Sequence, residues 1–333
     1  MSYGEIIDSA PDNLAIVDAL AKCQMQIRRH GKIMCSVSGG SDSDVMLDLI
    51  LRCGGKDKTT FVFFNTGLEY EATKKQIKYL NEKYDIEIQV IPPEKPIPLC
   101  VREYGVPFWS KQVSDMIERL QRHGFQWEDE PLDVLLQKYP KCKSALRWWC
   151  NDWSRTDRPC PFDIGYVSKL KEFLIANPPT FLISNKCCQY AKKLPAKKYL
   201  VGHNYDLNCV GVRQAEGGAR ATRYKNCYTA GKDEPDQYRP LFWFSDTDKA
   251  VYDEHYSIKH SDCYEVWGMK RTGCAGCPFG RNFEEELALA EKYEPKFHKA
   301  MLKVFGQSYE YRRQFESFRK NYAHEHTHVH NGG

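Results

Sequence analysis

Apolar stretches of strand length alternate with longer amphipathic segments over residues 13–91. The alternation predicts helices over about 13–30, 44–52 and 70–83, and strands over 33–37, 60–64 and 86–91. Strands that alternate with helices of this length form a parallel sheet covered by helices on both faces. We therefore expect an α/β fold with a Rossmann-like sheet, whose ligands bind at the carboxyl ends of the strands.

The pattern changes after Pro92, where a proline-rich connection leads into a helical and aromatic segment. We interpret residues 101–180 as a helical insertion or lid in a sheet domain whose first half is 1–100. The apolar run "KYLVGH", residues 198–203, predicts a strand that returns to the sheet. Residues 181–333 are expected to hold the remainder of that domain, a cysteine-bearing region and C-terminal helices.

Composition narrows the class of protein. Hydrophobic residues make up 42% and charged residues 28% of 333 positions, which is a soluble globular composition. The net charge of +4 is too small to argue for a nucleic-acid partner by itself. No signal peptide and no apolar run of membrane-spanning length is present. The 14 cysteines then point to reduced thiols, metal binding or catalysis, so we expect a cytoplasmic protein with no membrane partner.

A small polar loop, "SGGSDS", lies between the first predicted strand and its helix. It consists of Ser38, Gly39, Gly40, Ser41, Asp42 and Ser43. Glycines let backbone N–H groups approach an anion, the helix N-terminus adds the positive end of its dipole, and serine hydroxyls can donate to phosphate oxygens. Asp42 would repel phosphate alone but suits a magnesium ion that bridges phosphates. The spacing fits equally an ordinary turn in which Asp42 or Ser43 caps the helix.

The loop resembles the SGGxDS pyrophosphate loop of the PP-loop ATP pyrophosphatases, the adenine nucleotide alpha-hydrolase-like superfamily. Three further stretches, "FFNTGLEY", "GVRQAEGGAR" and "RPLFWFSDTDKAVYDEH", resemble its branch of adenylyl-sulfate and phosphoadenylyl-sulfate reductases, and the likeness covers residues 33–279. The resemblance implies that the chain binds ATP and Mg²⁺. The residues it matches to nucleotide binding are Ser38, Gly39, Gly40, Ser41, Ser43, Thr66, Gly67 and Glu69. Those it matches to catalysis are Asp42, Arg213 and Arg220, with Glu216 in the same arginine loop.

Two cysteine pairs carry a metal signal, the adjacent pair in "NKCCQY" and the CxxC pair in "RTGCAGCPFG". A CxxC turn points two thiolates to one side, which suits an iron–sulfur cluster, a structural zinc or a redox couple, and buried thiols need no metal. The pattern is similar to the cluster-binding reductases of this branch. This resemblance implies a 4Fe–4S cluster held by Cys187, Cys188, Cys274 and Cys277.

Six other cysteines divide into two groups. Those that could replace one cluster ligand are Cys150, Cys160 and Cys263. Those on the first strand–helix unit, expected to be buried apolar fillers, are Cys23, Cys35 and Cys53.

The chain departs from the sulfate-activating reductases in three ways. It has no glutamate-cysteine-glycine-leucine-histidine segment, whose cysteine attacks sulfur in those enzymes, and its SGG loop is intact where theirs is commonly degraded. It also has Glu216-Gly217 where the family often has glutamate-serine. An intact cradle implies a pyrophosphate group, and therefore ATP cleaved between its α and β phosphates.

Three functions remain open on this basis. The first is ATP-dependent sulfur insertion, in which an acceptor oxygen is adenylated and sulfide on an open iron, or a cysteine persulfide, replaces AMP. The second is a reductase that releases sulfite from adenylyl-sulfate or its 3′-phosphorylated form. The third is a nucleotide-binding module of a larger assembly without catalysis.

The sulfur acceptor is not identified by the sequence. A nucleobase, a DNA backbone oxygen and a small metabolite all fit, and a homodimer is allowed. Lys111 and Arg147 are either lid contacts to substrate or solvated surface. Five tryptophans of the lid either stack on bases or form the core of a helical subdomain; they are Trp109, Trp127, Trp148, Trp149 and Trp153.

Overall fold

The computed structural model describes residues 3–154, 156, 158–217 and 223–329, and it divides into two compact units. The first unit contains Met1–Pro96 and Tyr190–Ala275, and the second contains Ile97–Gln189 and Gly276–Gly333. Each unit is therefore assembled from two separate segments of the chain. No helix in the described part is long and apolar enough to cross a membrane.

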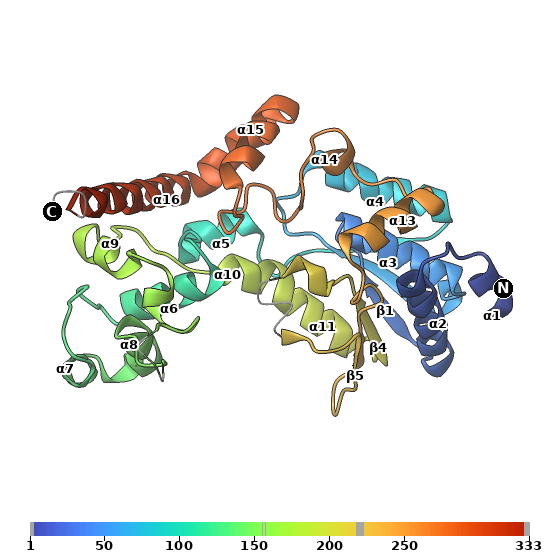
Figure 1. The fold of residues 1–333 in the computed structure, drawn as a ribbon, viewed down its shortest axis with the longest axis horizontal. Coiled ribbons are helices and arrows are strands. Elements are labelled where there is room, and N and C mark those ends of the chain that lie inside the picture. Colours follow the sequence, from blue (N-terminus) through green and yellow to red (C-terminus); the bar gives the residue numbers. More distant parts are fainter. Residues whose placement is uncertain (1–2, 155, 157, 218–222, 330–333) are drawn as a thin grey trace. The chain divides into compact units, whose positions relative to one another are not determined.

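The first unit is built on a six-stranded sheet with the strand order β3-β2-β1-β4-β6-β5 (Figure 1). The strands are β1 (Ile33–Ser36), β2 (Thr59–Phe64), β3 (Ile88–Ile91), β4 (Leu207–Val210), β5 (Tyr228–Thr229) and β6 (Asp236–Tyr238). All neighbours pair in parallel except the edge strand β5, which runs antiparallel to β6. The expected Rossmann-like α/β fold is confirmed. Because β1 pairs with both β2 and β4, the carboxyl ends of β1 and β4 form the switch point where such sheets bind ligands.

One predicted strand of this unit is wrong. Residues 198–203 belong to the helix α11 (Leu194–Gly202) and its C-cap, and the strand that returns to the sheet is β4. Pro195 lies in the first turn of α11, where its missing N–H has no partner to lose. The other helices of the unit are α1 (Tyr3–Asp8), α2 (Leu14–Arg29), α3 (Ser41–Arg52), α4 (Glu71–Tyr84), α13 (Asp246–His255) and α14 (Asp262–Glu265).

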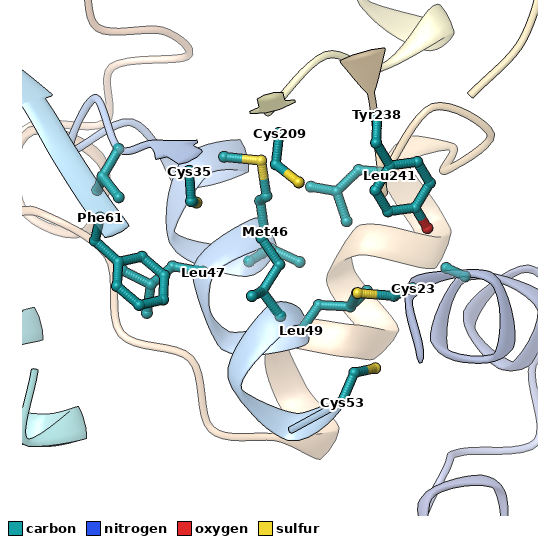
Figure 2. Close-up of a cluster of buried hydrophobic side chains, with 14 of the residues drawn as sticks. Cys23, Cys35, Met46, Leu47, Leu49, Cys53, Phe61, Cys209, Tyr238 and Leu241 are labelled. Atoms are coloured by element: carbon teal, nitrogen blue, oxygen red, sulfur yellow. The ribbon is translucent and has the colours of Figure 1, made fainter. Parts of the chain in front are cut away.

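The core of the first unit contains several cysteine side chains among its apolar ones (Figure 2). Cys23 and Cys35 are fully buried and Cys53 is 4% exposed, which confirms them as apolar fillers. Cys209 of β4 lies in the same cluster. Burial raises the pKa of the Cys35 thiol, so it stays neutral and packs as a small hydrophobic group.

The second unit is helical. Its helices are α5 (Ile97–Tyr104), α6 (Lys111–Arg122), α7 (Leu132–Lys138), α8 (Lys143–Trp149), α9 (Leu170–Ala176), α10 (Lys186–Cys188), α15 (Phe283–Tyr293) and α16 (Pro295–Val329). Trp148 and Trp149 are buried in its core, where Trp109 and Trp127 also pack. Trp153 is 40% exposed and lies under the guanidinium of Arg147 at 3.8 Å. Four of the five tryptophans therefore serve packing.

Candidate nucleotide-binding site

The loop after β1 has the geometry of a tight backbone cradle. Gly39 has a φ of +68°, and a Cβ added there would lie 2.8 Å from Cγ2 of Thr73, so both conformation and space require glycine. The helix α3 begins at Ser41, earlier than predicted, and its N-cap is Gly40, with no side-chain cap. The interpretation of Asp42 or Ser43 as the N-cap is therefore wrong. The loop leads directly into the positive end of a helix of 12 residues.

The three serines of the loop have two different roles: one stabilises the loop, and two lie at its surface. Ser43 is buried; its hydroxyl donates to the Gly40 carbonyl at 2.7 Å and accepts from the Ser38 N–H at 3.1 Å. The Ser38 hydroxyl also donates to Ser43 Oγ, at 3.2 Å. Ser38 is exposed and Ser41 is half-buried. Ser43 thus fixes the loop, and Ser38 and Ser41 are the hydroxyls placed to meet a ligand.

The structure brings together Asp42 and Arg213, which the sequence separates by 171 positions. Arg213 follows β4, is 9% exposed, and donates to Asp42 at 2.9 Å and to Asp246 at 2.7 Å. Gly211 permits this approach, because a Cβ there would lie 3.3 Å from the Asp42 carbonyl oxygen. Burial raises the pKa of Asp42, and the positive charge of Arg213 opposes that rise. Two predicted catalytic side chains therefore form one ion pair at the switch point, in which Arg213 is buried and Asp42 is half-buried.

The turn after β2 lies at the same edge of the sheet. Thr66 and Glu69 are both buried, and the Thr66 hydroxyl donates to Glu69 Oε1 at 2.6 Å. Gly67 has a φ of +78°, and a Cβ there would lie 2.8 Å from Cβ of Pro96. Burial raises the pKa of Glu69, and Lys192 acts against this. In this structure the hydrogen bond between Thr66 and Glu69 stabilises the turn.

A buried network behind the loop was missed by the sequence analysis. Asp44, in the first turn of α3, is fully buried and accepts from Gln76 at 3.0 Å; its Oδ2 lies 3.0 Å from Nδ1 of His260. Nε2 of His260 lies 3.2 Å from Asp253, and Lys249 is 2.5 Å from the same carboxylate. Although burial opposes its charge, hydrogen bonds to Asp253 and Asp44 raise the pKa of His260 to about 9. No local motif signals a histidine 216 positions from its partner.

Tyr264 and Thr272 also reach the loop, and the sequence analysis missed both. Their hydroxyl oxygens lie 2.7 Å apart, and the Thr272 N–H donates to the Tyr264 oxygen at 3.0 Å. A Cβ added to Gly40 would meet these two hydroxyls at 3.2 and 3.4 Å. The segment before Cys274 therefore packs against the loop of residues 38–43 through the hydroxyls of Tyr264 and Thr272.

One family model matches part of this arrangement. Residues 32–126 match the phosphoadenosine phosphosulfate reductase domain. This part of the chain is therefore similar to that domain, and the match does not extend to the rest of the sequence. The matched segment begins one residue before β1 and includes the whole SGGSDS loop. It also includes β1, β2 and β3, and the match leaves the reaction open.

Individual relatives are distant. An uncharacterised protein of Methanocaldococcus jannaschii, MJ0066, is 25% identical over 252 residues, which are 74% of this chain and 36% of that protein. The chain thus spans about a third of that relative's length.

Two solved structures have low structural similarity to the chain. The phosphoadenylyl-sulfate reductase of Candida auris has a TM-score of 0.39 at 14% identity, over 75% of this chain and 87% of that one. The U34-tRNA thiolase NcsA of Methanococcus maripaludis was solved with its [4Fe-4S] cluster. It has a TM-score of 0.34 at 14% identity, over 90% of this chain and 79% of that one. Likeness at this level says nothing of what this protein binds.

The four predicted cluster ligands are divided between the two units: Cys274 belongs to the first, and Cys187, Cys188 and Cys277 belong to the second. Cys187 is buried, and the other three are half-buried. No group of three or more His, Cys, Asp or Glu side chains able to hold a metal ion occurs among the described residues. The cluster therefore stays a prediction.

The remaining candidates are scattered. Glu216 pairs with Arg271 at 3.4 Å, and Arg220 lies outside the described residues. In the second unit, Lys111 is exposed at the start of α6, and Arg147 pairs with Asp152 at 2.5 Å. The role of these last two side chains as substrate contacts stays a prediction.

Proposed function

We propose that this protein is an ATP-dependent sulfur-transfer enzyme, which adenylates an acceptor oxygen and then replaces that oxygen with sulfur. The observation that carries the proposal is the intact loop. Its obligate Gly39, the absence of a side-chain cap on α3 and the Asp42–Arg213 pair form a cradle for a pyrophosphate group.

The first step cleaves ATP between its α and β phosphates. The acceptor oxygen attacks the α-phosphorus, the bond from that phosphorus to the bridging oxygen breaks, and pyrophosphate leaves with the bonding electron pair. Ser38, Ser41 and the backbone amides at the start of α3 would hold the pyrophosphate. Arg213 would stabilise the negative charge that grows on the phosphates as the bond breaks.

The chain also offers a ligand for the metal that accompanies ATP. Asp42 would bind Mg²⁺, since it is a carboxylate at a loop that otherwise presents donors to phosphate. Magnesium, when bound, neutralises phosphate charge. Arg213 contacts Asp42 at 2.9 Å and so holds this carboxylate at the mouth of the loop.

The second step exchanges oxygen for sulfur. A hydrosulfide ion attacks the adenylated carbon of the acceptor, the carbon–oxygen bond breaks, and AMP leaves with the oxygen. Adenylation is what makes this displacement possible, because AMP is a far better leaving group than hydroxide. No step of this sequence needs an electron donor.

Binding of ATP tests the first step without knowledge of the acceptor. We expect the protein to bind α,β-methylene-ATP with magnesium in calorimetry, pyrophosphate to compete for the site, and Asp42→Asn to weaken binding by about tenfold or more. Asp57→Asn, an exposed aspartate of the same unit, is the matched control and should bind as the wild type does. Failure of the wild type to bind the analogue would remove the proposal.

Sulfite release separates this function from the runner-up, a reductase of adenylyl-sulfate or its 3′-phosphorylated form, which the family match favours. The wild type is incubated anaerobically with each sulfated nucleotide and a thiol reductant. We expect no sulfite. Catalytic release of sulfite would instead assign the reductase.

The cluster prediction has its own test. We expect anaerobically purified protein to contain iron and acid-labile sulfide, and both to fall in Cys274→Ser and Cys277→Ser. The control is Cys227→Ser, a half-buried cysteine outside both predicted pairs. Unchanged iron in both variants would exclude these ligands, and zinc in place of iron would exclude the cluster.

A further inference from the structure

The hairpin formed by β5 and β6 lies at the edge of the sheet (Figure 1). A cavity of about 910 Å³ lies along it. Four cationic side chains line it, Arg223, Lys225, Lys232 and Arg239. Two acidic residues, Asp233 and Glu234, also line it. Since Glu234 lies 3.9 Å from Lys197, the cavity keeps an excess of positive charge.

Arg239 is the unusual member of this set, because it is an arginine with only 1% of its surface exposed. Its guanidinium donates to the Asn226 carbonyl at 3.1 Å, to the Thr229 hydroxyl at 3.2 Å and to Gln237 Oε1 at 3.5 Å. Every one of these acceptors is neutral. Its Nε has no hydrogen-bond partner among the described residues.

A buried cation surrounded by neutral acceptors is energetically costly unless an anion joins it. Burial lowers the pKa of Arg239, and the side chain of Tyr224 acts against this while the charge of Arg223 acts in the same direction as burial. The ring of Tyr224 lies 3.9 Å from the Arg239 guanidinium and covers one of its faces. The hairpin thus holds the Arg239 guanidinium in a fixed position. Among the described residues, no carboxylate forms an ion pair with it.

The position of Arg239 relates this cavity to the PP-loop. Arg239 directly follows β6, and β6 runs parallel to β4, with Cys209 opposite Tyr238. The ends of β1, β4 and β6 therefore lie on the same edge of the sheet, and neighbouring strands are about 4.8 Å apart. The backbone of Arg239 thus lies about two strand spacings from the line of β1, and its guanidinium reaches back along the hairpin to Thr229 and Gln237.

We propose that the hairpin cavity is a second anion site, which binds a phosphate group of the acceptor through Arg239 with Arg223 and Lys225. Its assignment to the acceptor rests on the proposed function, whereas its capacity to bind phosphate does not. Arg239 offers its Nε–H, which lacks a partner in the described part of the chain, and Arg223 and Lys225 add two further cations for phosphate oxygens. The site predicts that the acceptor is a nucleic acid strand or a small phosphorylated molecule.

The test measures phosphate binding while the PP-loop is filled. With α,β-methylene-ATP and magnesium at saturation, a fluorescein-labelled short single-stranded oligonucleotide is titrated by anisotropy, and ribose 5-phosphate and succinate serve as competitors. We expect Arg239→Met and the exposed pair Arg223→Ala/Lys225→Ala each to weaken probe binding about tenfold or more. For the oligonucleotide, the slope of log K against log salt should become shallower by about 0.7 for each phosphate that the variant no longer neutralises.

The matched control is Lys75→Ala/Lys78→Ala, which removes two exposed cations from α4 in the same unit. It should bind the probe as the wild type does. The double variant of Arg223 and Lys225 also guards against misfolding of Arg239→Met, because both of its side chains are exposed. Competition by ribose 5-phosphate assigns a phosphomonoester, and binding that only the oligonucleotide achieves assigns a strand.

Three results would overturn the proposal: no binding of either phosphate probe by the wild type, equal binding by the variants and the control, or displacement by succinate as effective as by phosphate. Calorimetry with the ATP analogue is run on every variant and keeps the two proposals apart. A wild type that binds the phosphate probe through Arg239 but not the ATP analogue removes the proposed function and leaves the cavity site standing.

Discussion

His260 should make the stability of this protein depend on pH in the neutral to alkaline range. The ring is 11% exposed and lies between two carboxylates, at 3.0 Å from Asp44 and 3.2 Å from Asp253. Its pKa rises from the ordinary 6.5 to about 9. A group whose pKa is higher in the folded state stabilises the fold fully below its unfolded value, and that stabilisation is lost as the pH rises through the folded value.

The magnitude follows from the two pKa values. At about 1.36 kcal/mol per pKa unit, the charged ring contributes on the order of 3 kcal/mol near pH 6.5 and less than about 0.5 kcal/mol at pH 9. His260→Gln removes this charge and leaves Asp44 buried beside a neutral side chain. The difference in unfolding free energy between the wild type and His260→Gln should therefore shrink by about 2–3 kcal/mol over this range.

Urea denaturation at closely spaced pH values measures this difference. The comparison with the variant cancels the contribution of the buried thiols, which also titrate at alkaline pH. His255→Gln, an exposed histidine on α13, is the control, and its profile should follow the wild type. A constant difference between wild type and His260→Gln across the neutral to alkaline range would refute the reasoning, since it would mean that His260 carries no stabilising charge.

Three further substitutions test the site and the second unit. Gly39→Ala forces an alanine to a φ of +68° and into contact with Thr73 at 2.8 Å, so the unfolding free energy should fall by about 1–2 kcal/mol with a loss of ATP-analogue binding; an unchanged urea midpoint would contradict this. Tyr264→Phe removes the acceptor of the Thr272 N–H, which should cost about 1 kcal/mol and speed exchange of that amide with deuterium, and equal exchange rates would argue against the contact. Trp148→Ala opens a cavity in the core of the second unit and should cost about 3–5 kcal/mol in calorimetry, whereas a cost below about 1 kcal/mol would mean that the side chain is not packed.

The sequence predicts the first half of the sheet well because its strands are apolar runs bounded by turns. β2 is the run Thr59–Phe64 and ends at the predicted turn. The later strands are too short and too polar for such a signal: β5 is Tyr228–Thr229, and β6 is Asp236–Tyr238. The short apolar run at 198–203 fits a helix as well as a strand, and the wrong choice there follows from that ambiguity.

The residues of the candidate site also divide into those that the sequence predicts and those that it does not. The loop and Arg213 are predictable because each lies in a contiguous motif at a strand end. His260 and Tyr264 are not predictable, because they reach the site only when a distant segment of the chain packs against α3. No motif near them in the sequence indicates that contact. The positive charge of Arg239 looks ordinary in sequence, and only its burial among neutral acceptors makes it a candidate ligand group.

The split of the first unit into Met1–Pro96 and Tyr190–Ala275 has a consequence for how the protein is made. During synthesis β1, β2 and β3 emerge early, but the second neighbour of β1 is β4, which the ribosome delivers only after the whole segment 97–189. Until then one edge of β1 carries unpaired backbone groups and can pair wrongly with other chains. The loop of residues 38–43 also lacks its ion pair between Asp42 and Arg213 during this interval. Chaperone capture should accordingly concentrate on nascent chains that end before β4, and ribosome profiling of chaperone-bound chains would locate that interval.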